Sequence, residues 1–379
     1  MNKYFSAEDD NEDCCCCKWC EDCYKKNITK NNKNEQQLEI NNKNIEKENN
    51  KDKEEENKED ENKEEEDKKK EEEISKEFTN TKTLLGHESN VTAITQLKSG
   101  KLATGGYDNT IRIWDIAKNE GDKIIKEDEK ILVLLEFEEN KLLSGTANNI
   151  HLWDLNSNSE IYEKSFEGHI LWVMGLVKID NKRFASASND VHIKVWDYDS
   201  VECLMDLTEH TNCILSLVLL RNGKLCSGSA DDSIKIWDIE KKECIQTLTG
   251  HEKWVRCVFE LDNGIIVSGS QEGIKLWGLN KDNIDGEYVL LKTIKEHKNT
   301  VRTFCQVDEE HFASGSFDYT IKIWKINTWE CVQTLDGHID NIIGIIKLKK
   351  EGKQAIASCS SDKSIKIWEK ELPKKEEEN

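Results

Sequence analysis

The sequence predicts an all-β fold built from repeats, because one pattern of 28 residues, clearest from His297 to Trp324, returns along the chain. Seven tryptophans fall in register, and the six steps between Trp114 and Trp368 average about 42 residues. β-Branched runs end in these tryptophans, as in Ile234-Lys235-Ile236-Trp237, and indicate strands. A repeat of this length is typical of a four-stranded blade, so the sequence predicts a seven-bladed β-propeller.

The first element in the chain, residues 1–77, is expected to be a long, disordered, acidic arm. Residues 1–78 carry 16 basic and 26 acidic side chains, and from Glu46 to Glu73 no hydrophobic side chain occurs. A low-complexity segment of Asn, Lys and Glu cannot bury enough apolar surface to form a core. Without apolar heptad positions it also has no seam for a coiled coil.

The tip of this arm holds a cysteine cluster that leaves three interpretations open. Four thiolates could ligate zinc or an iron–sulfur cluster, but the loop that usually separates two close pairs is missing. Grouped cysteines beside lysines also suit S-palmitoylation, which would hold the protein at a membrane. The third interpretation is a cysteine-rich tip that does neither. The cysteines concerned are Cys14, Cys15, Cys16, Cys17, Cys20 and Cys23.

The propeller itself is expected over residues 78–369, followed by a charged tail, residues 370–379. Lys82–His87 matches Gln246–His251, the strand that precedes a later repeat, although no tryptophan repeat comes before it. The last repeat, in turn, has no outer strand after Trp368. We therefore predict that the strand around Thr81 to Leu85 completes the seventh blade and closes the ring, which removes an open sheet edge.

Within each repeat the inward-facing residues indicate a bulged first strand. Val301, Phe304 and Val307 follow His297 at offsets of four, seven and ten, and an offset of three needs one extra residue in a strand. A bulge is therefore expected near offset five in every blade. Asn-Gly pairs at residues 222–223 and 263–264 predict tight turns to the next strand.

The chain resembles the WD-repeat family of β-propellers over roughly residues 79 to 369. Gly-His pairs open four repeats, and Trp-Asp pairs close four. The Gly-His pairs are Gly86-His87, Gly168-His169, Gly250-His251 and Gly337-His338, and the Trp-Asp pairs are Trp114-Asp115, Trp153-Asp154, Trp196-Asp197 and Trp237-Asp238. The resemblance implies the seven-bladed fold and a narrow top face on which partner proteins dock.

Histidine, a hydroxyl residue, aspartate and tryptophan recur in five equivalent sets. The resemblance implies a structural network in which the indole N–H bonds the hydroxyl, the hydroxyl meets the imidazole, and aspartate holds the other ring nitrogen. A hydrolase would assemble a single nucleophile and base, so repetition argues against catalysis. The sets are His87, Thr104, Asp108 and Trp114; His169, Ser186, Asp190 and Trp196; His210, Ser227, Asp231 and Trp237; His297, Ser314, Asp318 and Trp324; and His338, Ser358, Asp362 and Trp368.

Two repeats depart from this pattern. The second repeat has Lys126 where histidine is expected and Ala147 or Asn148 where aspartate is expected, although Ser144 remains. The fifth repeat keeps His251 and Ser268 but is one residue shorter and offers Glu272. These two blades are predicted to be the least rigid.

Seven further residues are predicted to bind a partner. In WD-repeat proteins, offsets three and five after the histidine, and the residue before the aspartate, look toward the top face. Aromatic residues and arginine dominate interface energetics. The residues at these places are Trp172, Met174, Trp254, Arg256, Arg302, Tyr107 and Phe317. The alternative is that Trp172 and Trp254 only cover blade edges. Trp329 is expected on the opposite face.

Composition limits the possible functions. With 54 Lys plus Arg against 75 Asp plus Glu, the net charge of −21 disfavours nucleic-acid binding. No catalytic motif or cofactor motif occurs, so we expect a monomeric, non-enzymatic scaffold for proteins or peptides that needs no cofactor. Neither a secretory signal nor a long apolar run is seen, which predicts a cytoplasmic protein, peripheral at a membrane if the cysteines are acylated.

Two alternatives to a plain scaffold remain at this point. One is a membrane-tethered signalling adaptor that uses the cysteine cluster. The other is the substrate-recognition subunit of a ubiquitin ligase, although a Trp-Asp-x-Arg signature is missing. Ala117, Asn156, Asp199 and Glu240 fill the last place of that signature.

Overall fold

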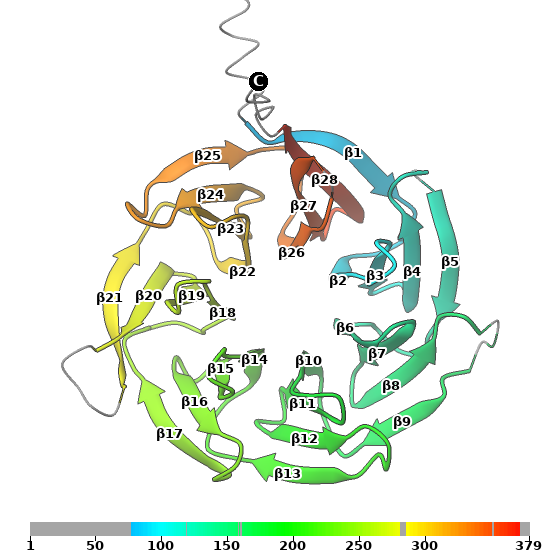
Figure 1. The fold of residues 1–379 in the computed structure, drawn as a ribbon, viewed down its shortest axis with the longest axis horizontal. Coiled ribbons are helices and arrows are strands. Elements are labelled where there is room, and N and C mark those ends of the chain that lie inside the picture. The colour runs from blue at the N-terminus through cyan, green and yellow to red at the C-terminus, as the bar shows by residue number, and fades with distance from the viewer. Residues whose placement is uncertain are drawn as a thin grey trace, which may run out of the picture. The chain divides into compact units, whose positions relative to one another are not determined.

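The computed structural model describes residues 77–118, 120–157, 159, 161–280, 286–350 and 352–371, which form a closed ring of seven four-stranded antiparallel sheets (Figure 1). One strand of each sheet faces the centre of the ring, and the fourth lies on the rim. The predicted seven-bladed, all-β propeller is therefore confirmed. The cysteine cluster and nearly all of the predicted arm and tail lie outside the described residues.

The blades follow one another along the chain, and only the seventh takes a strand from elsewhere in the sequence. From centre to rim, the blades are β2 (Val91–Gln96), β3 (Leu102–Gly106), β4 (Thr110–Asp115) and β5 (Glu120–Lys126); β6 (Val133–Glu138), β7 (Lys141–Gly145), β8 (Asn149–Asp154) and β9 (Lys164–Glu167); β10 (Val173–Lys178), β11 (Arg183–Ser188), β12 (Ile193–Asp197) and β13 (Cys203–Leu207); β14 (Ile214–Leu219), β15 (Leu225–Ser229), β16 (Ile234–Asp238) and β17 (Glu243–Leu248); β18 (Cys257–Glu260), β19 (Ile266–Ser270), β20 (Gly273–Leu279) and β21 (Tyr288–Ile294); β22 (Val301–Gln306), β23 (His311–Ser316), β24 (Ile321–Lys325) and β25 (Cys331–Leu335); and β26 (Ile342–Leu348), β27 (Lys353–Ser360), β28 (Ser364–Glu371) and β1 (Thr79–Leu85).

The hydrophobic core lies between neighbouring blades. Ile321 and Ile323 of the sixth blade share one buried cluster with Ile356 and Trp368 of the seventh. Small residues on the second strands allow this close approach, since a Cβ on Gly105 would lie 2.3 Å from Ile131 of the next blade. Each blade therefore leaves one apolar face uncovered unless its neighbour is present, and seven blades bury all of these faces only by closing.

The predicted bulge is present in five blades. In the first, third, fourth, sixth and seventh blades, the register between the inner two strands shifts around the residue five places after the histidine. In the fifth blade the pairing begins only at Cys257, and in the second the shift lies between Glu136 and Glu138 instead. The bulge turns an extra side chain toward one end of the ring.

Strand β1 closes the ring, as predicted. It pairs antiparallel with β28 from Thr79 opposite Glu369 to Leu85 opposite Ser364, and Leu84 faces Ile365 (Figure 1). Just before β1, the Gln333 side chain accepts a hydrogen bond from the Phe78 N–H at 3.0 Å and donates one to the Phe78 carbonyl at 2.8 Å. The first described strand is therefore held by both the seventh and the sixth blades.

Candidate partner-binding face

Five blades contain the same buried hydrogen-bond network. In each, the tryptophan Nε1–H donates to the Ser or Thr hydroxyl at 2.7–2.9 Å, and that hydroxyl lies 2.7–2.8 Å from the histidine Nε2. The histidine Nδ1 lies 2.7–2.8 Å from the aspartate. Every group in the chain of bonds is already occupied, so the network rigidifies the blade and leaves no hydroxyl open to a substrate.

The aspartates of these networks are held in the ionised form. Burial alone would raise the pKa of Asp190, but the hydrogen bond and charge of His169 lower it to about 2. Burial lowers the pKa of His87 despite its contact with Asp108. The same carboxylates also accept backbone N–H groups from the loop after the histidine, for example from Glu88 at 2.8 Å. They therefore fasten the loops of the top face to the blades.

The second blade builds its network from different residues. The prediction that Lys126 takes the histidine place is wrong: Lys126 is exposed, and Glu127 lies there instead. A Glu127 carboxylate oxygen accepts the Ser144 hydroxyl at 2.7 Å, while Trp153 donates to Ser144 at 2.9 Å. His151, from β8, approaches both Glu127 oxygens at 3.1 Å. An acid thus takes the histidine place in this blade, and an imidazole from the third strand, in the position of Lys194 in blade three, contacts it. The 17-residue spacing from Glu127 to Ser144 is the signal that sequence reasoning missed.

In the fifth blade Glu272 takes the place of aspartate. Its carboxylate lies 3.2 Å from the His251 Nδ1, and it accepts the Glu252 N–H at 3.0 Å. Burial lowers the pKa of His251 to about 4, because the contact with Glu272 does not offset the loss of solvation. A longer side chain thus compensates for a turn that is one residue shorter.

All seven residues predicted to bind a partner line one cavity of about 330 Å³ at the mouth of the ring. A repeated backbone bond explains why residues from distant offsets meet there. In five blades, the carbonyl of the residue three places after the histidine accepts the N–H of the residue before the aspartate, at 2.8–2.9 Å. Trp172 and Asn189 form one such pair. The bulge adds a third side chain at offset five, and blades one, three and four each present three side chains to the cavity.

Aromatic rings and two arginines dominate this cavity. Trp172 and Trp254 are 39% and 49% exposed, so neither is simply a buried cover for a blade edge. Tyr107 meets Trp172 edge to face at 6.3 Å between ring centroids, and Arg256 lies 4.8 Å from the Trp254 ring centroid. Arg302 donates to the Arg256 carbonyl at 3.3 Å. The side chains thus form a connected surface that combines apolar rings with guanidinium groups.

Sequence reasoning missed part of the lining of this cavity. Several of the missed residues occupy the same offset five in blades where no aromatic residue or arginine drew attention to it. Leu132 was missed because the register of the second blade was misassigned. The additional lining residues are Asn90, Thr92, Leu132, Asn189, Cys213, Leu215, Ala230, Ile343 and Ser361.

Trp329 differs from Trp172 and Trp254. It lies in the turn between β24 and β25 with a φ of 63°, partly buried and packed against Phe312 at 6.3 Å between ring centroids. Its ring completes the core between blades five and six, which favours a structural role.

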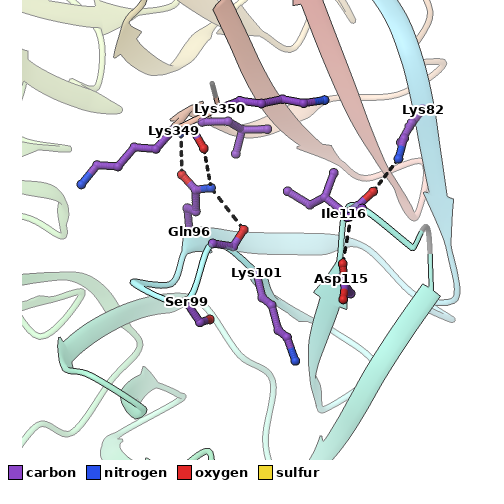
Figure 2. A pocket seen from close by; sticks show the side chains of 11 residues that line it. Lys82, Gln96, Ser99, Lys101, Asp115, Ile116, Lys349 and Lys350 are labelled. Carbon is purple, nitrogen blue, oxygen red and sulfur yellow. Dashed lines mark hydrogen bonds between the residues drawn. The ribbon is translucent and has the colours of Figure 1, made fainter. Parts of the chain in front are cut away.

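A second hollow of about 330 Å³ lies at the opposite end of β2, between blades one and seven. Figure 2 shows that Lys101, Lys349 and Lys350 point in different directions there. Lys82 donates to the Ile116 carbonyl at 2.5 Å, and Gln96 accepts the Lys349 N–H at 2.7 Å. The lysines thus do not converge on one point, and both hydrogen bonds join the first blade to the seventh.

Within the described residues, no group of three or more His, Cys, Asp or Glu side chains is placed to hold a metal ion. The same residues form no helix of the length and apolar character needed to cross a membrane. The six clustered cysteines, with the acylation and metal binding predicted for them as alternatives, lie outside this part of the chain.

The sequence was also compared with known proteins. A model of the WD domain, G-beta repeat, matches residues 78–115, 201–238, 242–278, 288–325 and 329–369, just over half of the chain. An uncharacterized WD repeat-containing protein of Schizosaccharomyces pombe is 39% identical over 85 residues, which are 21% of this chain and 22% of that protein. Nuclear distribution protein PAC1-1 of Uncinocarpus reesii is 44% identical over 57 residues, 15% of this chain and 13% of that protein.

A third relative is the probable cytosolic iron-sulfur protein assembly protein 1 of Cryptococcus neoformans, 29% identical over 127 residues, which cover 24% of this chain and 28% of that protein. The chain thus spans less than a third of the length of each of these relatives. They share the repeat, and their names differ widely. Propellers built from this repeat act typically as interaction scaffolds. By its repeats and its fold, this chain belongs to the WD-repeat family.

Proposed function

We propose that the protein is a non-enzymatic scaffold that binds partner proteins or peptides at the cavity lined by Trp172, Trp254 and Arg302. One observation carries the proposal: seven residues chosen from the sequence by repeat offset line a single cavity. Trp and Arg are the residues that most often anchor interfaces. Exposed indole rings at the mouth of a rigid ring offer a partner large apolar contacts at little cost in conformational entropy.

Affinity capture from cell lysate tests the proposal, with the wild type compared with a Trp172→Ala plus Trp254→Ala variant. The expected result is a loss of specific partners, identified by mass spectrometry, for the double variant. A matched control is Ile245→Ala plus Val332→Ala, because these side chains are also 39% and 49% exposed but lie on the outer strands β17 and β25. Equal recovery by the wild type and the tryptophan variant would place the partner site elsewhere.

We further propose that this scaffold works in the cytoplasm, and at a membrane when its cysteine cluster is acylated. The support is the grouping of Cys14–Cys17, Cys20 and Cys23 next to Lys18. Acyl-thiol exchange on the full chain, and on a variant in which these six cysteines are serines, tests the anchor. Labelling of the wild type alone supports acylation, and no label on either protein rules out this anchor.

A further inference from the structure

We infer that the ligand of the cavity is a peptide segment that carries an anionic side chain next to an apolar one. The inference rests on the proposed function, because it names the chemistry of the partner that docks on that face. It follows from the way in which charge and apolar surface are distributed around the mouth of the ring.

The charge of the cavity is opposite to that of the chain. The protein has a net charge of −21, yet none of the described residues that line the cavity is Asp or Glu. Two arginines, Arg256 and Arg302, are its charged lining residues. An adjoining hollow of about 250 Å³, lined by Lys253, Trp254, Arg256, Gln271 and Thr300, also lacks a carboxylate. The mouth of the ring is therefore a cationic spot on an acidic protein, where an anion is drawn in and a cation is not.

The two arginines have no carboxylate partner within the described part of the chain. Elsewhere on the surface, Arg183 pairs with Asp180 and Arg221 pairs with Asp262. Arg256 instead lies over the Trp254 ring, and Arg302 bonds the Arg256 carbonyl. A carbonyl satisfies one N–H of a guanidinium, which has five to donate. Both side chains thus keep donors for a ligand, in the planar arrangement that suits a carboxylate or a phosphate.

The electrostatic cost of these arginines also favours an anionic ligand. Burial, followed by the charge of Arg302, lowers the pKa of Arg256, so its charged form is destabilised where it stands. An incoming anion offsets both effects, because it supplies the missing hydrogen bonds and an opposite charge. Arg302 additionally lines a smaller cavity of about 170 Å³ formed by the inner strands. Its guanidinium is therefore placed to hold an anionic group that enters the ring.

The other side of the cavity is apolar. Leu132, Trp172 and Met174 line it on blades two and three, and the exposed Ile170 and Leu171 precede Trp172 on the same loop. Apolar side chains that remain exposed next to a cavity mark a binding surface. A ligand that satisfies both sides must present an apolar side chain to blade three and an anionic one to blades five and six. A peptide can do this, whereas a nucleic acid would bring many phosphates to an acidic protein.

Binding of the full-length protein to an array of nonapeptide pools tests the inference. The central residue of the pools is Glu, Gln, phosphoserine or Ser, and a neighbouring position is Leu or Asn. We expect the Glu or phosphoserine pools with Leu to retain the wild type roughly tenfold better than their neutral counterparts, the ratio expected for a charge-assisted hydrogen bond. The better of the two anionic pools identifies the anion as carboxylate or phosphate.

Arg302→Gln and Arg256→Gln should lose this preference, and Arg221→Gln, which removes a guanidinium paired with Asp262, should keep it. Thermal melts of the variants establish that the ring is intact. Equal retention of Glu and Gln pools by the wild type, with both reduced by Trp172→Ala plus Trp254→Ala, overturns the anionic ligand but leaves the docking face in place. If the pools retain the tryptophan variant as well as they retain the wild type, the proposed function is overturned as well. Stronger binding of a labelled dT12 oligonucleotide than of any pool would also contradict the inference.

Discussion

Removing Glu127 should destabilise the propeller far more than removing its neighbour Lys126. The Glu127→Ala change leaves the Ser144 hydroxyl without its acceptor at 2.7 Å and His151 without its carboxylate at 3.1 Å. The Glu127 and His151 side chains are 2% and 10% exposed, so water cannot replace the lost partner. Removing one partner of a buried hydrogen-bonded pair leaves the other unsatisfied and lowers the free energy of unfolding by about 2–4 kcal/mol. Lys126 is exposed, and its change to Ala should stay within about 0.5 kcal/mol.

Urea denaturation followed by tryptophan fluorescence measures both changes, because Trp153 belongs to the same network. The two variants should unfold with similar dependence on urea concentration and with well-separated midpoints. A Glu127→Gln variant adds a finer test, since the amide can still accept the Ser144 hydroxyl but carries no charge for His151. Its midpoint should fall between those of the wild type and Glu127→Ala. Equal midpoints for Glu127→Ala and Lys126→Ala would refute the network centred on Glu127 in the second blade.

Three further predictions concern the same ring. Burial lowers the pKa of His251 to about 4, below its unfolded value of 6.5, so the unfolded state binds more protons between these two values. The free energy of unfolding should therefore fall as the pH drops from about 6.5 to about 4. In the His251→Gln variant, the urea midpoint should depend less on pH over that range. Leu84 is buried and Leu85 is exposed on β1, so Leu84→Ala should cost about 2–4 kcal/mol and Leu85→Ala almost nothing; equal urea midpoints would argue against closure by β1. The amides of β7 and β19 should exchange with deuterium before those of β23, because blade two builds its network from other residues and the acid of blade five lies 3.2 Å from its histidine rather than 2.8 Å as in blade six. Uniform protection in a mass-spectrometric measurement would contradict this.

Much of the fold was predictable because it repeats. The seven tryptophans in register predicted the number of blades, and their interval predicted four strands in each. The unpaired strand before His87 predicted the closure by β1, which the pairing of Leu84 with Ile365 confirms. Regular offsets also indicated which side chains share the top face. These inferences succeed since each blade imposes the same constraints on its residues, and seven copies make a local pattern readable.

What could not be predicted depends on exceptions to the repeat and on contacts between blades. The second blade has Glu127 rather than histidine, and its shorter spacing from Ser144 to Trp153 shifted the alignment by one residue, so Leu132 was overlooked as a cavity residue. The contact between Arg302 and the Arg256 carbonyl joins residues 46 positions apart and depends on how two inner strands converge at the centre. Sequence offsets place each arginine on the face but do not place them side by side.

The pairing of β1 with β28 has a consequence for biosynthesis. Thr81 and Ile367 lie next to each other in the finished ring, yet 286 residues separate them along the polypeptide. At a translation rate of about 5–20 residues per second, β1 leaves the ribosome roughly 15–60 s before its partner exists. Until then it is a strand without its sheet partner, and the apolar Leu84 side chain stays exposed. Among the described strands, the one synthesised first is thus the last that can dock, and its pairing with β28 completes the ring.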